Sequence, residues 1–276
     1  MSKTTVHYEV VDRVAHVTLD RPEVGNALNE QMHAELGETW QRTNEDDGVW
    51  SILLKGSGQD FCLGEDFTEW AEYAETNDMP PRWRAAEDWA GQYRGKGPTL
   101  GFPEPSEGLP AKPLITAIQG RCSGSAMLFV AHSDFTICAD DAGFSIPNVQ
   151  YGLGAAEEII SLTRMNVSRA AISRLALLGE TMPAERAREL GLVIETVPAA
   201  QLQERAEELV TTLTRESAPL AVRGSKAGIW NTIDLPFDAG NRWAHEFLNE
   251  VRFRSEDSRE GPRAFAEKRK PQWQAK

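Results

Sequence analysis

The 276-residue sequence has few cysteines, no long hydrophobic run and no recognisable leader, and each shortage excludes a class of protein. Its three cysteines, Cys62, Cys122 and Cys138, show no CxxC spacing, so neither a disulfide framework nor a zinc site is indicated. We expect reduced, mostly buried thiols and no bound metal. No apolar run approaches the ~20 residues of a bilayer span, and no charged and then apolar segment follows Met1. The sequence therefore predicts no membrane association and a cytoplasmic location.

Positive charge is scarce as well. The chain has 29 Lys and Arg against 42 Asp and Glu, a net charge of −13. Nucleic-acid binding needs a basic stripe, and here the cations are scattered, so we expect no nucleic-acid partner. One basic segment, residues 263–270, is the exception, and it is interpreted as a solvated helix end whose cations complement the helix dipole.

The first half of the chain alternates strands and helices. Residues 6–19 alternate apolar and polar positions around Asp12 and Arg13, which predicts an antiparallel hairpin. Asn29 is placed to cap a helix that runs to about Thr43. Further strands are expected at residues 49–55, 114–118 and 135–138. Strand, turn, helix and strand at this spacing are typical of βαβ units, so we predict an α/β fold with a parallel sheet.

The second half is expected to be helical. From Ala155 onward the one strand that the pattern predicts lies at residues 192–196. An amphipathic stripe runs over residues 202–213, and Pro236 opens a long helix toward Phe253. We divide the chain accordingly into a core and a helical C-terminal region, residues 1–197 and 198–276.

Residues 71–112 interrupt this regular pattern. The segment is crowded with prolines and glycines, and it carries aromatic residues that include Trp83 and Trp89. So long a stretch without periodicity is uncommon inside a domain unless it is functional. We interpret it as a lid-like insertion that shapes a substrate pocket.

Two short glycine-containing turns are the best candidates for chemistry. Residues 61–66 and 120–125 each leave an apolar strand and enter a helix. A backbone N–H at each turn lies at the positive end of a helix dipole, where it has no partner within the helix. Two such donors that converge on one carbonyl oxygen form an oxyanion hole.

These turns, with their order and spacing, resemble those of the crotonase (enoyl-CoA hydratase/isomerase) superfamily. The resemblance continues along nearly the whole chain, in segments at Ser133-Asp134, 137–139, 142–144, 178–180, 184–187, 191–193, 255–257, 260–261, Phe265 and Lys268-Arg269. It implies a crotonase-like ββα spiral core followed by a helical region that forms trimers, often paired as hexamers. It also implies an acyl-CoA thioester substrate, with no cofactor beyond the CoA that the substrate carries.

The resemblance assigns roles to particular residues. The oxyanion donors are the backbone N–H groups of Glu65 and Ser125, which follow Gly64 and Gly124. Phe265 and Lys268 match positions that hold the adenine and phosphates of CoA. Lys55, at the end of the strand before the first turn, is a second candidate for the phosphates.

The sequence departs from the family where acid–base chemistry is done. Hydratases of the family place two glutamates over the double bond, and this chain has Leu128 and Asn148 there. Leucine cannot transfer a proton, so the usual pair is absent. Asn148 could orient a water or a carbonyl, but we favour a turn residue that bonds its own backbone.

The nearest carboxylates along the chain are Glu157 and Glu158, at the place where isomerase, dehalogenase and carbon–carbon hydrolase branches carry their acid. We take Glu157 as the leading proton carrier, although an acidic residue in a first helical turn is also favoured by the dipole alone. Glu65 could act from the first turn. Asp66 is interpreted as a helix cap, and His132 as a core residue.

An enoyl-CoA isomerase or an atypical hydratase fits these residues best, because one acid can shuttle one proton between carbons. Two alternatives stay open. One is an acyl-CoA-binding homologue that has lost catalysis. The other is a carbon–carbon bond hydrolase of the diketone type, which needs a histidine pair that the sequence does not reveal.

Overall fold

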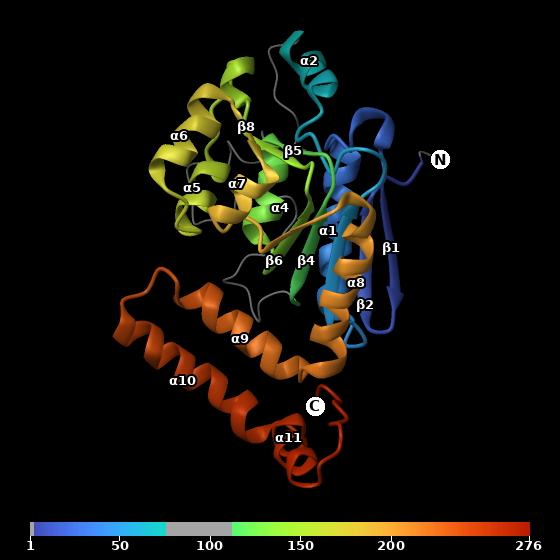
Figure 1. Cartoon of the computed structure of the whole chain (residues 1–276), viewed down its shortest axis with the longest axis vertical. Coiled ribbons are helices and arrows are strands. Elements are labelled where there is room, and N and C mark those ends of the chain that lie inside the picture. Colours follow the sequence, from blue (N-terminus) through green and yellow to red (C-terminus); the bar gives the residue numbers. More distant parts are fainter. Residues whose placement is uncertain (1–2, 76–111) are drawn as a thin grey trace.

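The computed structural model of the chain describes residues 3–75 and 112–276. Most of the insertion expected at residues 71–112 lies outside these ranges. The described part shows an α/β core with a helical hairpin below it (Figure 1).

Six strands form the main sheet of the described residues, in the order β1-β2-β3-β4-β6-β9. They are β1 (Val6–Val11), β2 (Val14–Leu19), β3 (Ser51–Gly56), β4 (Leu114–Ile118), β6 (Phe135–Ala139) and β9 (Glu195–Val197). Strands β1 and β2 pair antiparallel, and the remaining neighbours pair parallel. Asp12 and Arg13 turn the hairpin with φ of 48° and 70°, the left-handed pair that a two-residue hairpin prefers. The predicted hairpin and parallel sheet are confirmed.

A smaller sheet holds β5 (Arg121–Ser123), β7 (Gly143–Ser145) and β8 (Thr181–Pro183). Strand β8 corrects the expectation that the chain from Ala155 onward is helical apart from one strand at residues 192–196. It pairs antiparallel with β7, and three residues ending in a proline carry no alternation that could reveal a strand. The predicted strand at 192–196 is also displaced, since β9 begins at Glu195.

The helices largely follow the predicted pattern. Asn29 caps the first of them, accepting a hydrogen bond from the Met32 N–H at 2.9 Å. Pro236 precedes the long helix α10, as expected. The helices are α1 (Glu30–Glu45), α2 (Phe67–Glu75), α4 (Met127–His132), α5 (Glu157–Arg164), α6 (Arg169–Leu178), α7 (Ala184–Glu189), α8 (Leu202–Thr211), α9 (Pro219–Thr232), α10 (Phe237–Arg254) and α11 (Asp257–Ala266).

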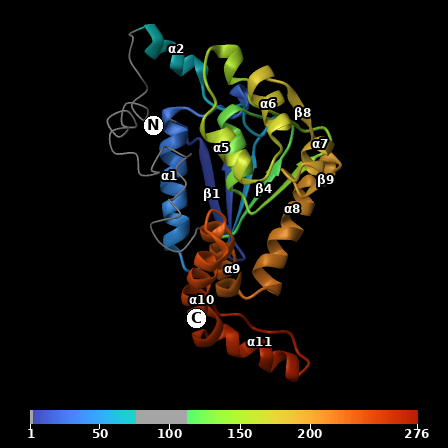
Figure 2. The same cartoon turned by 90° about the vertical axis from the view of Figure 1, so that its left-hand side faces the viewer.

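Helices cover both faces of the main sheet, with α1 on one side and α8 on the other (Figure 2). Alternate residues of β3 show the two cores: Ile52 and Leu54 pack in the cluster of α1, and Leu53 packs in the cluster of α8. Helix α8 lies beyond the boundary expected at 197/198, yet it shares a core with the sheet. The part of the C-terminal region that stands apart is the hairpin of α9 and α10 (Figure 1).

A buried ionic cluster attaches the hairpin to the core. Lys226 of α9 donates to the Asp134 carboxylate at 2.7 Å, and the Trp230 indole N–H donates to the same carboxylate at 3.0 Å. Asp134 also accepts from the Leu114 N–H at 2.7 Å, so one side chain joins α9 to the start of β4. The Asp134 carboxylate thus compensates the positive charge of Lys226 in a mostly buried position.

None of the helices in the described ranges combines the length and the apolar character that crossing a bilayer requires.

Candidate active site

The two glycine turns lie side by side. The Cys62 N–H donates to the Arg121 carbonyl at 3.2 Å, and the Ser123 N–H donates to the Cys62 carbonyl at 3.0 Å. The backbones of Cys62 and Cys122 form a parallel β-bridge. Both thiols are free and buried, as expected. Backbone hydrogen bonds therefore hold the first turn against the second just before each helix begins.

Two glycines allow this close approach. Gly64 has a φ of +87° and Gly124 a φ of +57°, which side chains other than glycine rarely adopt. A Cβ on Gly64 would lie 2.7 Å from the Ser123 carbonyl oxygen and 3.3 Å from the Ser125 nitrogen. The backbone amides of Glu65 and Ser125, which follow the two glycines, therefore lie on two segments that contact each other. Two adjacent amides at the starts of helices are the arrangement that an oxyanion hole needs.

Replacing Gly64 by Ala is expected to lower kcat/KM about a hundredfold. The added methyl group must displace the Ser123 carbonyl, and the loss of one oxyanion donor typically costs about 10²–10³ in rate. Gly37→Ala is the matched control, because a Cβ at Gly37 meets nothing within 4 Å, and a glycine inside a helix costs about 0.5–1 kcal/mol relative to alanine. We expect the control to keep full activity, as measured by steady-state kinetics. Equal activity of the two variants would contradict a role for the first turn.

Glu158, rather than Glu157, is the buried carboxyl of this region. Glu158 is 4% exposed, whereas Glu157 is half-buried. Burial raises the pKa of Glu158, helped by the negative charges of Glu157 and Glu65, so its carboxyl keeps a proton at higher pH than usual. Burial favours Glu158 over Glu157, the residue that the sequence led us to prefer: successive helical residues point about 100° apart, and the start of α5 directs the second glutamate inward.

The Asn148 side chain lies between this carboxyl and the second turn. Its Nδ2 is 3.5 Å from Glu158 Oε1, and its Oδ1 is 3.7 Å from the position of a Cβ on Gly124. The expected bond to its own backbone is not what the side chain does. Asn148 begins the short helical turn η3 (Asn148–Tyr151), whose backbone bonds are made without it.

The remaining candidates near the turns have structural partners. Asp66 accepts from the Thr68 N–H at 3.1 Å and pairs with Arg21 at 3.0 Å, which confirms the predicted helix cap. Leu128 is buried in α4. The His132 ring lies 2.8 Å from the Leu128 carbonyl oxygen and stacks on Trp230, and burial lowers its pKa, as fits a core residue.

Sequence reasoning missed one residue of this region. His33 of α1 places its Nε2 3.2 Å from Glu65 Oε2, and the two side chains are 11% and 13% exposed. The sequence did show that His33 lies one helical turn after the Asn29 cap. A side chain at that position contacts the segment that packs against the start of α1.

Two of the expected CoA-binding residues, Phe265 and Lys268, lie far from the turns within one chain. Lys55 is half-buried near the end of β3. Phe265 is 87% exposed, and Lys268 lies exposed just beyond α11. Figure 1 shows α11 at the bottom of the molecule, whereas α2 and β5, which flank the two turns, lie near its top.

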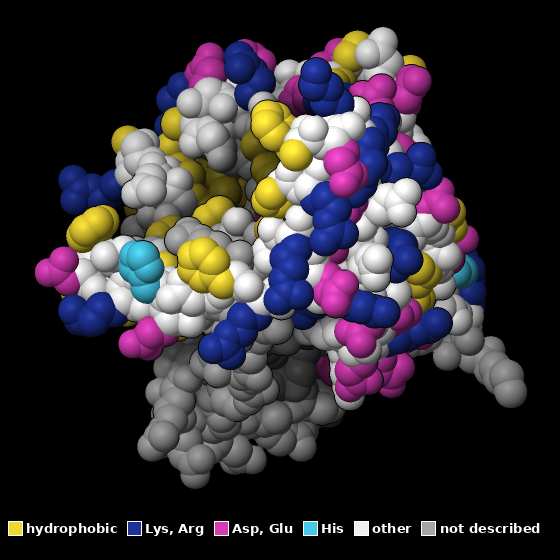
Figure 3. Space-filling view, turned by 90° about the horizontal axis from the view of Figure 1, so that it is seen from below, with side chains coloured by type: hydrophobic (Ala, Val, Ile, Leu, Met, Phe, Trp, Pro, Cys, Tyr) yellow, Lys and Arg dark blue, Asp and Glu magenta, His cyan; other side chains and the backbone are white. Residues whose placement is uncertain are grey.

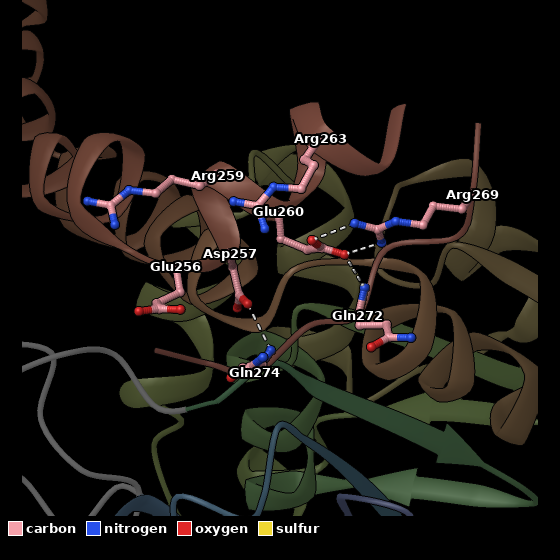
Figure 4. Close-up of a pocket in the computed structure, with 8 residues that line it drawn as sticks. All are labelled: Glu256, Asp257, Arg259, Glu260, Arg263, Arg269, Gln272 and Gln274. Atoms are coloured by element: carbon pink, nitrogen blue, oxygen red, sulfur yellow. Dashed lines mark hydrogen bonds and ion pairs between the residues drawn. The ribbon is translucent and has the colours of Figure 1, made fainter. Parts of the chain in front are cut away.

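A polar cavity of about 450 Å³ lies beside α11 (Figure 4). Its charged groups bind each other and the C-terminal tail. Arg269 pairs with Glu260, and Asp257 accepts from the Gln274 N–H at 2.8 Å. The residues that line the cavity thus attach the segment after α11 to that helix. Most cations of the basic segment 263–270 face solvent, as expected. Among the described residues, no cluster of His, Cys, Asp or Glu side chains could hold a metal ion.

Comparisons with known proteins identify the family of the chain. The model of the enoyl-CoA hydratase/isomerase family matches residues 9–101 and 110–276. The mevalonyl-coenzyme A hydratase of Aspergillus fumigatus is 30% identical over 93% of this chain and 90% of its own length. The carnitinyl-CoA dehydratase of Proteus mirabilis is 29% identical over 99% of each chain.

Solved structures give the same result for the fold. An enoyl-CoA hydratase/isomerase from Mycobacterium paratuberculosis superposes with a TM-score of 0.84 at 36% identity over 100% of both chains. An enoyl-CoA hydratase from Mycobacterium tuberculosis has the same TM-score at 30% identity, covering 99% of this chain and 100% of the other. The family match spans both glycine turns and the helical C-terminal region. The chain belongs to the enoyl-CoA hydratase/isomerase family.

Proposed function

We propose that this protein adds water to, or removes it from, an acyl-CoA thioester by stabilising an enolate. The observation that carries the proposal is the buried Glu158 carboxyl, with its raised pKa, in contact with Asn148, which in turn lies against the second of the two touching glycine turns. The printed names of the relatives, a mevalonyl-coenzyme A hydratase and a carnitinyl-CoA dehydratase, support this reaction class.

In the proposed reaction the thioester carbonyl accepts hydrogen bonds from the Glu65 and Ser125 N–H groups. These donors stabilise the oxyanion that forms when the proton on Cα leaves or arrives. The Glu158 carboxyl transfers the proton, and the Asn148 side chain orients both that carboxyl and the reacting water. A carboxyl whose pKa is raised toward neutrality is suited to both giving and accepting a proton.

Double-bond isomerisation is the second candidate. It is favoured by the absence of the usual pair of glutamates, because a single carboxyl can take a proton from one carbon and return it to another. Of the alternatives, a binding homologue without catalysis predicts affinity without turnover. A diketone-type hydrolase predicts cleavage of a carbon–carbon bond.

One experiment separates hydration, isomerisation and binding without catalysis. The full chain is incubated in D₂O with 2-enoyl-, 3-enoyl- and 3-hydroxyacyl-CoA esters, and the products are followed by NMR. We expect deuterium at Cα together with interconversion of the enoyl and hydroxyacyl esters. Conversion of the 3-enoyl ester alone identifies an isomerase. Binding of the esters without deuterium uptake would overturn the catalytic proposal.

We further propose that the protein assembles as a homotrimer or hexamer and that Phe265 and Lys268 reach the CoA of another copy. Their distance from the turns in one chain supports this arrangement. Figure 3 shows hydrophobic side chains gathered in a hollow on the lower face. The α9–α10 hairpin exposes several apolar residues, namely Ile229, Ile233, Leu235 and Phe237. Light scattering is expected to give three or six times the mass of the chain, and a monomer would contradict the assembly.

The reduced state of the three buried thiols supports a cytoplasmic location, which we propose on that ground.

A further inference from the structure

The carboxylate of Glu65 is held in place by a residue from another element. His33 Nε2 of α1 lies 3.2 Å from Glu65 Oε2, and both side chains are mostly shielded from water. The adjoining backbone is fixed as well, because the Leu28 N–H donates to the Gly64 carbonyl and the Asp66 N–H donates to the Leu28 carbonyl, at 2.8 Å and 3.0 Å. The start of α1 thus positions both the backbone and the side chain of the first turn.

Contacts lead from this pair to Glu158. Gly64 touches the turn at Gly124, the Asn148 Oδ1 lies against Gly124, and the Asn148 amide faces the Glu158 carboxyl. The negative charge of Glu65 is among the causes that raise the pKa of Glu158, after burial and the charge of Glu157. Two carboxylates from different elements, the first turn and α5, therefore lie within electrostatic reach of each other.

The other charged groups around Glu65 have partners of their own. Asp66 pairs with Arg21 at 3.0 Å, and Glu69 of α2 accepts from the Glu30 N–H at 3.0 Å. From α1 the imidazole of His33 contacts the Glu65 carboxylate, and from α5 the Glu158 carboxyl lies within electrostatic reach of it.

We propose that His33 is a positioning residue that holds the Glu65 carboxylate as the second proton-carrying group of the site, in place of the glutamates that Leu128 and Asn148 replace. The inference rests on the proposed function. In hydration, the water oxygen bonds to Cβ while one carboxylate takes a proton from that water. The other carboxyl gives a proton to Cα, so the carbon–carbon double bond becomes single and one water is added. Dehydration is the reverse.

The test compares two variants with a matched control. H33Q removes the positioning imidazole, and E65Q removes the carboxylate while leaving the backbone N–H. H16Q is the control, because His16 and Glu207 form a similar pair at 3.6 Å, in which the His16 side chain is also 11% exposed, on β2. Each variant is assayed for kcat, KM and the pH dependence of kcat/KM, and its thermal unfolding is recorded.

We expect E65Q to lower kcat about 10²-fold and H33Q about tenfold, with KM changed less than about threefold. In E65Q the acid limb of kcat/KM moves to lower pH, because losing a negative charge lowers the pKa of Glu158. Glu157→Gln also removes a negative charge that raises the pKa of Glu158, so a fall in kcat of E65Q beyond that of Glu157→Gln is the result that identifies proton transfer by Glu65. H16Q is expected to match the wild type.

The inference is overturned if wild-type turnover is present and E65Q keeps its kcat. It is overturned equally if H33Q is as active as H16Q. Should H33Q unfold at a lower temperature than the control, the kcat of E65Q compared with that of Glu157→Gln decides. The proposed function fails by a different result, namely wild-type protein that incorporates no deuterium from D₂O into any ester.

Discussion

Glu158→Gln is expected to reduce kcat by about 10²–10⁴-fold, the usual contribution of a general acid or base. The amide keeps the size of the side chain and its contact with Asn148, but it cannot carry a proton. Binding of an unreactive saturated acyl-CoA, measured by calorimetry, is expected to stay within about threefold of the wild type, because the lost interaction acts mainly in the transition state.

Glu157→Gln is the matched control, since it changes the neighbouring carboxyl on the same helical turn. We expect its kcat to fall less than about threefold. Its negative charge contributes to the raised pKa of Glu158, so removing it lowers that pKa and extends the base form to lower pH. The acid limb of kcat/KM should then move to lower pH. A large loss of kcat in Glu157→Gln with little loss in Glu158→Gln would reverse the assignment.

Asp134→Ala is expected to destabilise the protein by about 3–5 kcal/mol, as when one partner of a buried ion pair is removed. The substitution leaves the Lys226 ammonium, the Trp230 indole N–H and the Leu114 N–H without their common acceptor. Urea unfolding of the full chain measures the loss. The second substitution Lys226→Met is expected to restore part of the stability, because it removes the uncompensated charge.

The control for this prediction is Glu180→Ala, which breaks an ion pair of similar length with Arg174. That pair has a separation of 2.6 Å, but its side chains are 71% and 39% exposed, so its removal should cost less than about 1 kcal/mol. Similar losses in Asp134→Ala and Glu180→Ala would show that the buried cluster does not attach α9 to the core.

Local signals were enough to predict much of the fold. The 6–19 hairpin, the Asn29 cap and the strand at 114–118 each depend on residues within a few positions of one another. Strand β8 does not depend on neighbouring residues in this way, because it forms by pairing with the distant strand β7. The two glycine turns were recognised from their own residues, and the oxyanion hole expected of them implied their contact in space.

The side chains around the turns depended on information that the sequence pattern does not contain. Choosing Glu158 over Glu157 needs the rotation of α5, which a shift of one residue changes by about 100°. The His33–Glu65 contact joins residues 32 positions apart, and the Lys226–Asp134 pair joins residues 92 positions apart. No periodicity links such residues, so their pairing became visible only in three dimensions.

The β-bridge that pairs the backbones of Cys62 and Cys122 limits how substrate can enter. Both residues are fully buried, and the two segments exchange backbone hydrogen bonds at this point. Parting the glycine turns therefore requires opening of the core, which native proteins do about as rarely as they unfold globally. The amide hydrogens of Cys62 and Ser123 should be among the slowest to exchange with solvent. Acyl-CoA must then reach its carbonyl donors along the surface of a closed core, and any gate must lie outside these two turns.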